Sequence, residues 1–154
     1  MPEKELSNLL KADSTAPYGD FDIKQVKPIY GPKVFIASPY TLGDVAVNVK
    51  MAHDAFDFLL EHGFFPVMPL LAHYQHLQHP RGYRDWIAYA LTQLEGCNCM
   101  FRIPGTSTGA DNEELCANHW KIPVYNSLEA VFIAHNVVAK KDFPKIREKY
   151  YMTM

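Results

Sequence analysis

The chain has 154 residues, of which 48% are hydrophobic and 21% charged, and its formal net charge is −2. This length and composition are typical of one globular domain with a buried core. The small net charge offers no basic surface to a nucleic acid polymer, and no apolar run in the sequence reaches the length that spans a membrane. The N-terminal sequence lacks the pattern of a signal peptide, so we expect a cytoplasmic protein.

The pattern of apolar and turn-forming residues divides the sequence into three parts. Residues 1–32 are punctuated by proline and glycine, with a turn of helix indicated at Lys4–Leu10, and we interpret them as an N-terminal extension. Residues 33–139 carry the regular patterns of an α/β domain. Residues 140–154 form a basic and aromatic C-terminal tail, compatible with a short helix and a solvated charged face.

The first half of the domain is expected to run strand, helix, strand. Lys33–Ser38 is a β-branched and aromatic run of strand length, and Val45–His62 carries apolar residues at helical spacing. Phe64–Met68 is a second short strand, in which Pro66 favours the edge of a sheet because proline lacks an N–H donor. The short links between these elements imply parallel strands and a right-handed crossover.

A long connection follows at Pro69–Arg84, and long connections in compact domains tend to be functional. It contains the aromatic and basic side chains His73, Tyr74, His76, His79, Arg81 and Tyr83. The histidines are spaced by three, which raises the alternative of a metal site, but no acidic ligand lies among them. The three cysteines also lack zinc spacing, so we expect free thiols, no metal and no cofactor. We favour a loop that stacks on or hydrogen-bonds a base, and keep a solvated loop as the remaining alternative.

Helices and strands continue to alternate along the rest of the domain. We expect a helix, a strand, a helix, a strand and a final helix at Asp85–Glu95, Cys97–Ile103, Asp111–Trp120, Pro123–Tyr125 and Leu128–Ala139. The alternation predicts a three-layer, flavodoxin- or Rossmann-like α/β fold with a four- to five-stranded parallel sheet flanked by helices. Ligands bind such sheets beyond the carboxyl ends of the strands, where the loops Ser38–Asp44, Pro69–Arg84 and Pro104–Asn112 converge.

The stretch Pro104–Glu114 is predicted to be a loop that leads from a strand into the N-terminus of a helix. Free backbone N–H groups and the positive end of the helix dipole favour an anion there. Three hydroxyls and two glycines suit the close approach of a phosphate or sugar oxygen: Thr106, Ser107, Thr108, Gly105 and Gly109. A carboxylate in the first turn of the helix, Glu113, is expected to reach the same ligand and to be kept ionised by the helix dipole.

Two stretches of the sequence carry a family resemblance. The first is Phe35-Ile36-Ala37-Ser38-Pro39-Tyr40, followed by Asn48, Ala52, Gly63, Pro66-Val67 and Pro69. The second is Gly105, Ser107-x-Gly109-Ala110-x-x-Glu113-x-x-x-Ala117 and Lys121-Ile122-Pro123-Val124. Together they resemble the nucleoside 2-deoxyribosyltransferase-like superfamily, which includes nucleotide N-glycosidases, over residues 33 to about 131.

The resemblance implies cleavage of the N-glycosidic bond of a nucleoside 5′-monophosphate or nucleoside, by hydrolysis or by deoxyribosyl transfer. It places Glu113 at the position of the glutamate nucleophile, with Glu114 as the neighbouring alternative. A carboxylate can attack C1′ of a sugar as it becomes oxocarbenium-like. Asp85 is the only acid near the family's general-acid position, although it stands about five residues too early. Tyr40 matches a tyrosine that orients the nucleophile or the sugar.

The other expected site residues bind substrate. They are Ser38, Pro39, His73, Arg81, Gly105, Thr106, Ser107, Gly109, Asn112 and Ser127. The resemblance further implies a homodimer or larger homo-oligomer with shared pockets, in which Ser127 supplements the neighbour's site. The competing hypothesis is a nucleotide-binding or sensing protein that has the same pocket and no turnover.

Overall fold

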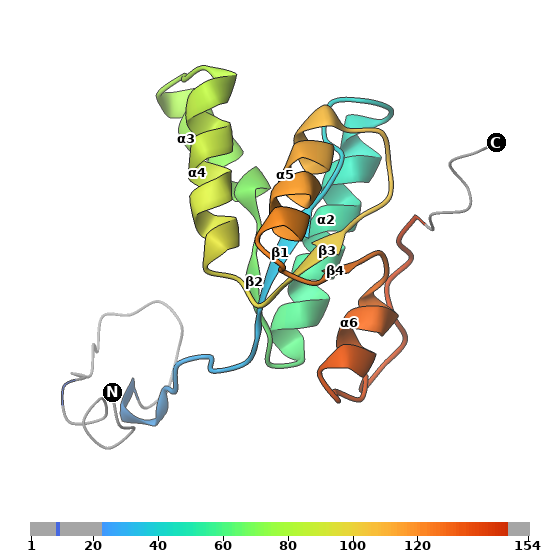
Figure 1. Cartoon of the computed structure of the whole chain (residues 1–154). Coiled ribbons are helices and arrows are strands. Elements are labelled where there is room, and N and C mark those ends of the chain that lie inside the picture. Colours follow the sequence, from blue (N-terminus) through green and yellow to red (C-terminus); the bar gives the residue numbers. More distant parts are fainter. Residues whose placement is uncertain (1–8, 10–22, 148–154) are drawn as a thin grey trace.

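The computed structural model describes Leu9 and residues 23–147 of the chain (Figure 1). Its centre is one parallel sheet with the strand order β2-β1-β3-β4. The strands are β1 Lys33–Ala37, β2 Phe65–Val67, β3 Cys99–Arg102 and β4 Val124–Tyr125. Helices cover both faces of this sheet, so the predicted three-layer, Rossmann-like α/β fold is confirmed.

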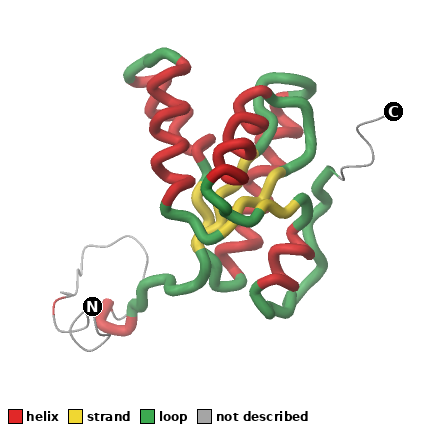
Figure 2. Tube along the Cα trace, in the orientation of Figure 1, coloured by secondary structure: helices red, strands yellow, loops and turns green. Residues whose placement is uncertain are grey.

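The helices lie between the strands, as Figure 2 shows along the chain trace. The α-helices are α2 Val45–Glu61, α3 His73–Gln78, α4 Tyr83–Glu95, α5 Thr108–His119 and α6 Leu128–Ala134. Two short 3₁₀ helices, η1 Ile23–Gln25 and η2 Pro69–Ala72, complete the described elements. Among the described residues, no helix combines the length and apolar character that crossing a lipid bilayer requires.

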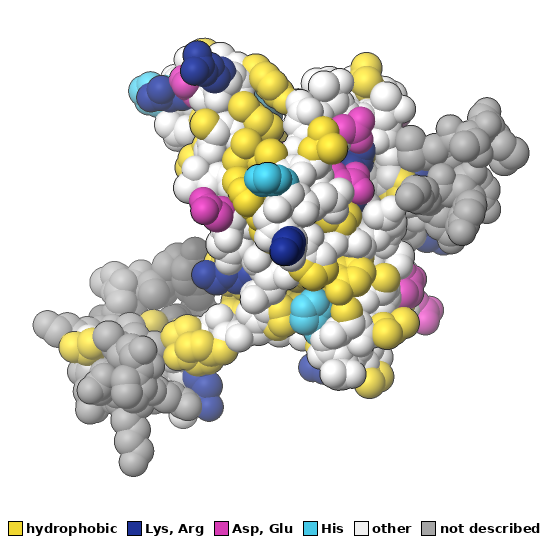
Figure 3. Space-filling view, viewed as in Figure 1, with side chains coloured by type: hydrophobic (Ala, Val, Ile, Leu, Met, Phe, Trp, Pro, Cys, Tyr) yellow, Lys and Arg dark blue, Asp and Glu magenta, His cyan; other side chains and the backbone are white. Residues whose placement is uncertain are grey.

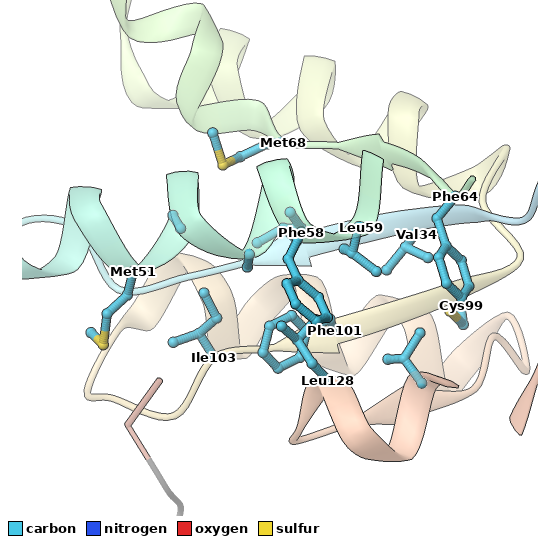
Figure 4. Packing of buried hydrophobic residues seen from close by; sticks show 14 of the residues in the cluster. Val34, Met51, Phe58, Leu59, Phe64, Met68, Cys99, Phe101, Ile103 and Leu128 are labelled. Atoms are coloured by element: carbon cyan, nitrogen blue, oxygen red, sulfur yellow. The ribbon is translucent and has the colours of Figure 1, made fainter. Parts of the chain in front are cut away.

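The two faces of the sheet bury two separate hydrophobic clusters. Alternate residues of β1 point to opposite faces, so Val34 and Ile36 pack with α2 and α6, whereas Phe35 and Ala37 pack with α4 and α5. Figure 4 shows the first cluster, in which Phe101 of β3 lies among side chains of α2 and α6. The continuous apolar runs of β1 and β3 follow from this burial on both faces.

The edge position predicted for the second strand is confirmed, since β2 is the outermost strand beside β1. Pro66, which cannot donate a ladder hydrogen bond, is therefore tolerated there. Before β2 the chain turns at Gly63, whose φ of +86° lies in the left-handed region that favours glycine. This turn ends α2 and starts the return to the sheet.

Beyond shifts of one or two residues at the ends of elements, four sequence predictions differ from the structure. Pro69–Arg84 is not an irregular loop, because η2 and α3 occupy most of it. Helix α5 begins at Thr108, three residues before the predicted Asp111, because the Ser107 side chain accepts a hydrogen bond from the Ala110 N–H and caps the helix there. Helix α6 ends at Ala134 and not at Ala139, since Asn136 takes a left-handed conformation with φ of +56°.

The fourth difference concerns the C-terminal tail, whose described part, residues 140–147, contains no helix. Phe143 and Ile146 pack against the cluster on the α2 and α6 face, so this segment is part of the folded domain's surface. Except for Leu9, the helical turn predicted at Lys4–Leu10 lies outside the described residues, as do residues 148–154 of the tail.

Candidate functional site

A cavity of about 250 Å³ lies at the C-terminal end of the sheet. Its wall is formed by the end of β1 and the following loop, by η2 and α3, and by facing sides of α4 and α5. Hydrophobic and aromatic side chains dominate the lining, and in the space-filling view such side chains gather over α4 on the side toward α5 (Figure 3). The polar exceptions include Ser38, His73, His76 and Glu113.

Glu113 is the buried carboxyl group of this cavity, with 8% of its surface exposed. It lies in the second turn of α5 and not in the first, as predicted, because the helix starts earlier. The dipole therefore favours its ionised form less than expected, since that effect falls off within the first turn. Desolvation by burial raises the pKa of Glu113 to about 7, although the positive charge of Arg102 acts in the opposite direction. No described residue donates a hydrogen bond to its carboxylate.

Glu114, the neighbouring alternative, has different surroundings. Its Oε2 lies 3.6 Å from Nε of Arg102, and it does not line the cavity. Arg102 also pairs with Asp111 at 2.9 Å and donates hydrogen bonds to the carbonyl oxygens of Ile103 and Gly105. Arg102 has 6% of its surface exposed. Its side chain therefore stabilises the strand-to-helix loop from the buried side.

The loop between β3 and α5 contributes fewer side chains to the cavity than its three hydroxyl-bearing residues led us to expect. Ser107 is occupied as the N-cap of α5, and Thr106 is exposed. Gly109 lines the cavity, whereas Asn112 lies exposed on α5 and outside its lining. At Gly105 the φ of +149° and the close approach of Pro39 and Arg147 leave no room for a side chain, so glycine is required there.

Tyr40 and His73 meet across the cavity from two different segments. The Tyr40 hydroxyl lies 3.4 Å from Nδ1 and 3.3 Å from Nε2 of His73, and the ring centroids are 5.3 Å apart. Ser38, the first residue of the loop after β1, also lines the cavity, while Pro39 is buried against Gly105. The structure therefore brings Ser38, Tyr40 and His73 together with Glu113.

Asp85 and Arg81 are not brought to this cavity. They form an exposed ion pair of 3.4 Å and line a second hollow, bordered by β2 and η2. Ser127 caps α6 through a hydrogen bond from the Ala130 N–H, and it lines neither of these two hollows.

Metal binding finds no support in the described part of the chain. No group of three or more His, Cys, Asp or Glu side chains there could hold an ion, and Nδ1 of His76 already accepts a hydrogen bond from the Trp86 indole. All three cysteines are free. Burial raises the pKa of the Cys97 thiol to about 11 and that of Cys99 to about 12, which disfavours the thiolate that binds metals.

Sequence reasoning missed most of the α4 side of the cavity. Tyr83, Trp86, Ile87 and Ala90 all line it, and their spacing of three, four and seven residues places them on one helical face. The sequence feature that could have indicated this wall is the aromatic content of the helical face, because Tyr83 and Trp86 closely follow the histidine-rich segment in the sequence.

Asn48 and Arg147 were also missed as organisers of the site. Asn48, which is 1% exposed, donates to the carbonyl oxygens of Tyr40 and Leu42 and accepts a hydrogen bond of 3.1 Å from Arg147. Arg147 also donates to the Pro104 carbonyl at 3.2 Å. The two side chains join the loop after β1 to the loop after β3, although they are far apart in the sequence.

Fold and site together define an α/β protein with a parallel sheet and a largely apolar cavity, holding a buried carboxyl group, at its C-terminal edge. The sequence profile of the family described as "Domain of unknown function (DUF7768)" matches residues 32–127, and the chain belongs to that family. A search of curated proteins found no match. A solved structure of a 2-deoxyribosyltransferase from Bacillus psychrosaccharolyticus is similar with 22% identity and a TM-score of 0.45, over 60% of this chain and 69% of the other.

Proposed function

We propose that this protein cleaves the N-glycosidic bond of a nucleoside 5′-monophosphate or nucleoside, with Glu113 as the nucleophile. The observation that carries the proposal is the Glu113 carboxyl group, buried at the cavity wall without a hydrogen-bond donor from the described residues. A perturbed carboxyl group in a cleft is a candidate for catalysis. The motif resemblance of Ser107-x-Gly109-Ala110-x-x-Glu113 supports the same residue.

The reaction that suits this arrangement has two steps. A carboxylate oxygen of Glu113 bonds to C1′ of the sugar while the bond from C1′ to the base nitrogen breaks, and that bond's electron pair leaves with the base. An acceptor then attacks C1′ and releases the Glu113 carboxylate. Water as the acceptor makes the protein a hydrolase, and a second base makes it a deoxyribosyltransferase.

The cavity lining supports a planar, partly apolar substrate. Aromatic rings such as Tyr40, Tyr83 and Trp86 offer faces and edges on which a base can stack. A volume of about 250 Å³ is small for a whole nucleotide, so the phosphate would lie outside the cavity, near the N-terminus of α5. There the first backbone N–H groups of the helix have no intrahelical acceptor.

The pKa of Glu113 predicts how turnover depends on pH. The nucleophile must be ionised, and with a pKa of about 7 its ionised fraction rises as the pH passes through 7. We therefore expect kcat/KM of the free enzyme to increase from pH 6 to pH 8. A profile that is flat over this range contradicts Glu113 as the nucleophile in the state described here.

The experiment that tests the proposal is chromatographic detection of free base. The purified protein is incubated with a panel of nucleosides and 5′-monophosphates, beside the matched variants Glu113→Gln and Glu114→Gln. We expect base release by the wild type, a loss of at least about 1,000-fold in Glu113→Gln, and retained activity in Glu114→Gln. Equal losses in both variants, or none in Glu113→Gln, overturn the assignment.

A second candidate function is nucleotide binding or sensing without turnover. The observation that favours it is the position of Asp85, which pairs with Arg81 outside the cavity and leaves Glu113 as the only carboxyl group among the described lining residues. Binding of a nucleotide, measured calorimetrically, with no base released from any member of the panel would make this function the better one.

The proposal includes the homodimer or larger homo-oligomer that the resemblance implies. In that assembly Ser127 of one subunit would supplement the site of the neighbouring subunit. Light scattering measures the molar mass directly. A monomer at the concentration of the activity assay would exclude a shared site.

A further inference from the structure

The ring of His76 is held from one side by two N–H donors. The indole Nε1 of Trp86 lies 2.8 Å from His76 Nδ1, and the backbone nitrogen of Arg81 lies 3.2 Å from the same atom. The His76 and Trp86 rings meet edge to face, with centroids 5.8 Å apart. Both rings line the cavity that contains Glu113.

These contacts fix the tautomer of His76. An indole N–H and a backbone N–H can only donate, so Nδ1 must be the unprotonated acceptor of both hydrogen bonds. The proton of the neutral ring is therefore on Nε2, at the opposite side of the imidazole. No described residue accepts a hydrogen bond from Nε2 of His76, which leaves this N–H available to a ligand in the cavity.

We propose that Nε2–H of His76 donates a hydrogen bond to the leaving base, an inference that rests on the proposed function. The acceptor is a ring nitrogen or carbonyl oxygen next to the glycosidic nitrogen, such as N3 of a purine or O2 of a pyrimidine. His76 thereby selects a base with an acceptor at that position. It also stabilises the negative charge that the base gains when the bond to C1′ breaks.

His76 acts as a hydrogen-bond donor and not as the acid that protonates the base. A neutral imidazole that gave up its Nε2 proton would become an anion, and a second proton on Nδ1 would displace both Trp86 and Arg81 from it. The electron pair of the broken bond passes to the base nitrogen, and the base takes its proton from water. No carboxyl group is needed for this step, so the position of Asp85 outside the cavity is compatible with turnover.

Trp86 is a positioning residue in this arrangement. Its indole N–H orients the imidazole, as an outer partner orients a metal-bound histidine. The variant Trp86→Phe keeps an aromatic ring in the cavity wall and removes the donor. The variant therefore separates the contribution of the indole donor from that of the apolar surface, while the Arg81 backbone N–H still donates to Nδ1 of His76.

The test compares two leaving groups in matched variants. Base release from the best nucleotide of the panel is measured beside release of 4-nitrophenolate from the aryl glycoside of the same sugar, because nitrophenolate leaves without assistance. The variants are His76→Phe, which lacks a donor; His76→Gln, whose amide can replace Nε2–H; and Trp86→Phe. His79→Gln is the control, since His79 does not line the cavity. Thermal unfolding of each variant monitors folding.

We expect His76→Phe to lower base release by about 100-fold, the effect of removing one preorganised donor. His76→Gln is expected to recover at least a tenth of the wild-type rate, Trp86→Phe to fall between these two variants, and His79→Gln to match the wild type. Release of 4-nitrophenolate should change less than 3-fold in all of them. Equal losses with both leaving groups, or no recovery in His76→Gln, overturn the role of His76. Absence of base release by the wild type instead refutes the proposed function itself.

Discussion

Arg102 and Glu113 are both charged side chains buried at the C-terminal end of the sheet, but their surroundings are opposite. Arg102 donates hydrogen bonds to two backbone carbonyl groups and pairs with Asp111. Glu113 faces a largely apolar cavity, and its carboxylate has no hydrogen-bond donor among the described residues. The two residues have 6% and 8% of their surface exposed, so burial alone does not distinguish them.

The difference separates a structural charge from a functional one. A buried charge with several partners holds its neighbours in one geometry, and here the two terminal nitrogens of Arg102 hold the strand-to-helix loop. A buried carboxyl group without partners costs stability whenever it ionises, which the raised pKa of Glu113 expresses. We interpret Arg102 as the support and Glu113 as the reacting group.

The largest stability effect is expected at Arg102. Replacement by alanine leaves two carbonyl groups and the Asp111 carboxylate without their donor, and should lower the free energy of unfolding by about 4 kcal/mol. The matched control is Arg81→Ala, which removes an exposed ion pair and should cost less than about 1 kcal/mol. Urea denaturation of both variants measures the difference. Similar losses in the two would mean that Arg102 does not support the loop.

The variant Glu113→Gln should have a stability effect that depends on pH. Below pH 4.5 the carboxyl group is protonated in the folded and the unfolded chain, so the substitution changes little. As the pH rises toward 7 the unfolded chain loses the proton first, and the wild type is destabilised relative to the variant. Above pH 7 the variant should be more stable by about 3 kcal/mol, from 1.36 kcal/mol per unit of pKa.

Denaturation at pH 4 and pH 8 measures this effect of Glu113→Gln directly. A stability difference that is the same at both values contradicts the unpartnered carboxyl group on which the comparison with Arg102 is based.

The Asn48 and Arg147 contact should behave as a coupled pair. Asn48→Ala and Arg147→Ala each break the link between the loops after β1 and β3. A double-mutant cycle in the unfolding free energy is expected to give a coupling of about 1.5 kcal/mol, the value typical of a hydrogen bond to a charged group. Additive effects would show that the C-terminal segment does not fasten these loops.

The smallest effect is expected at the two serine caps. Ser107→Ala and Ser127→Ala each remove the acceptor for one backbone N–H, and each should lower the unfolding free energy by about 1 kcal/mol. The variants Ser107→Asp and Ser127→Asp should keep the wild-type unfolding free energy if the serines act as caps, because the aspartate side chain also accepts the hydrogen bond. An unchanged stability in Ser107→Ala would mean that its hydroxyl is free for a ligand.

Except for η1, η2 and α3, the order of the strands and helices followed from the sequence because local patterns specify it. Lys33–Ala37 and Cys99–Arg102 are short apolar runs between turn residues, and α2 carries a clear apolar stripe. The boundaries at α5 and α6 were wrong, because a capping hydrogen bond of Ser107 and the backbone of Asn136 fixed them, and neither changes the apolar pattern.

The site could be predicted only in part, because it is assembled from segments far apart in the sequence. The motif that contains Glu113 is local, so this residue was placed in the candidate site from the sequence. Asn48 and Arg147 meet through the tertiary fold, and nothing near either residue indicates the other. Trp86 has the spacing of a core residue, and only the neighbouring α3 shows that its face borders a cavity.

The most direct test of Glu113 as the nucleophile is to trap the glycosyl-enzyme. A 2′-fluorinated analogue of the best substrate destabilises the oxocarbenium-like transition states, so the covalent intermediate lasts longer. The protein is quenched during turnover and its peptides are analysed by mass spectrometry. We predict one added glycosyl group on the peptide of residues 103–121, located at Glu113 and absent in Glu113→Gln. Label on Glu114, or base release without any labelled peptide, would contradict the account.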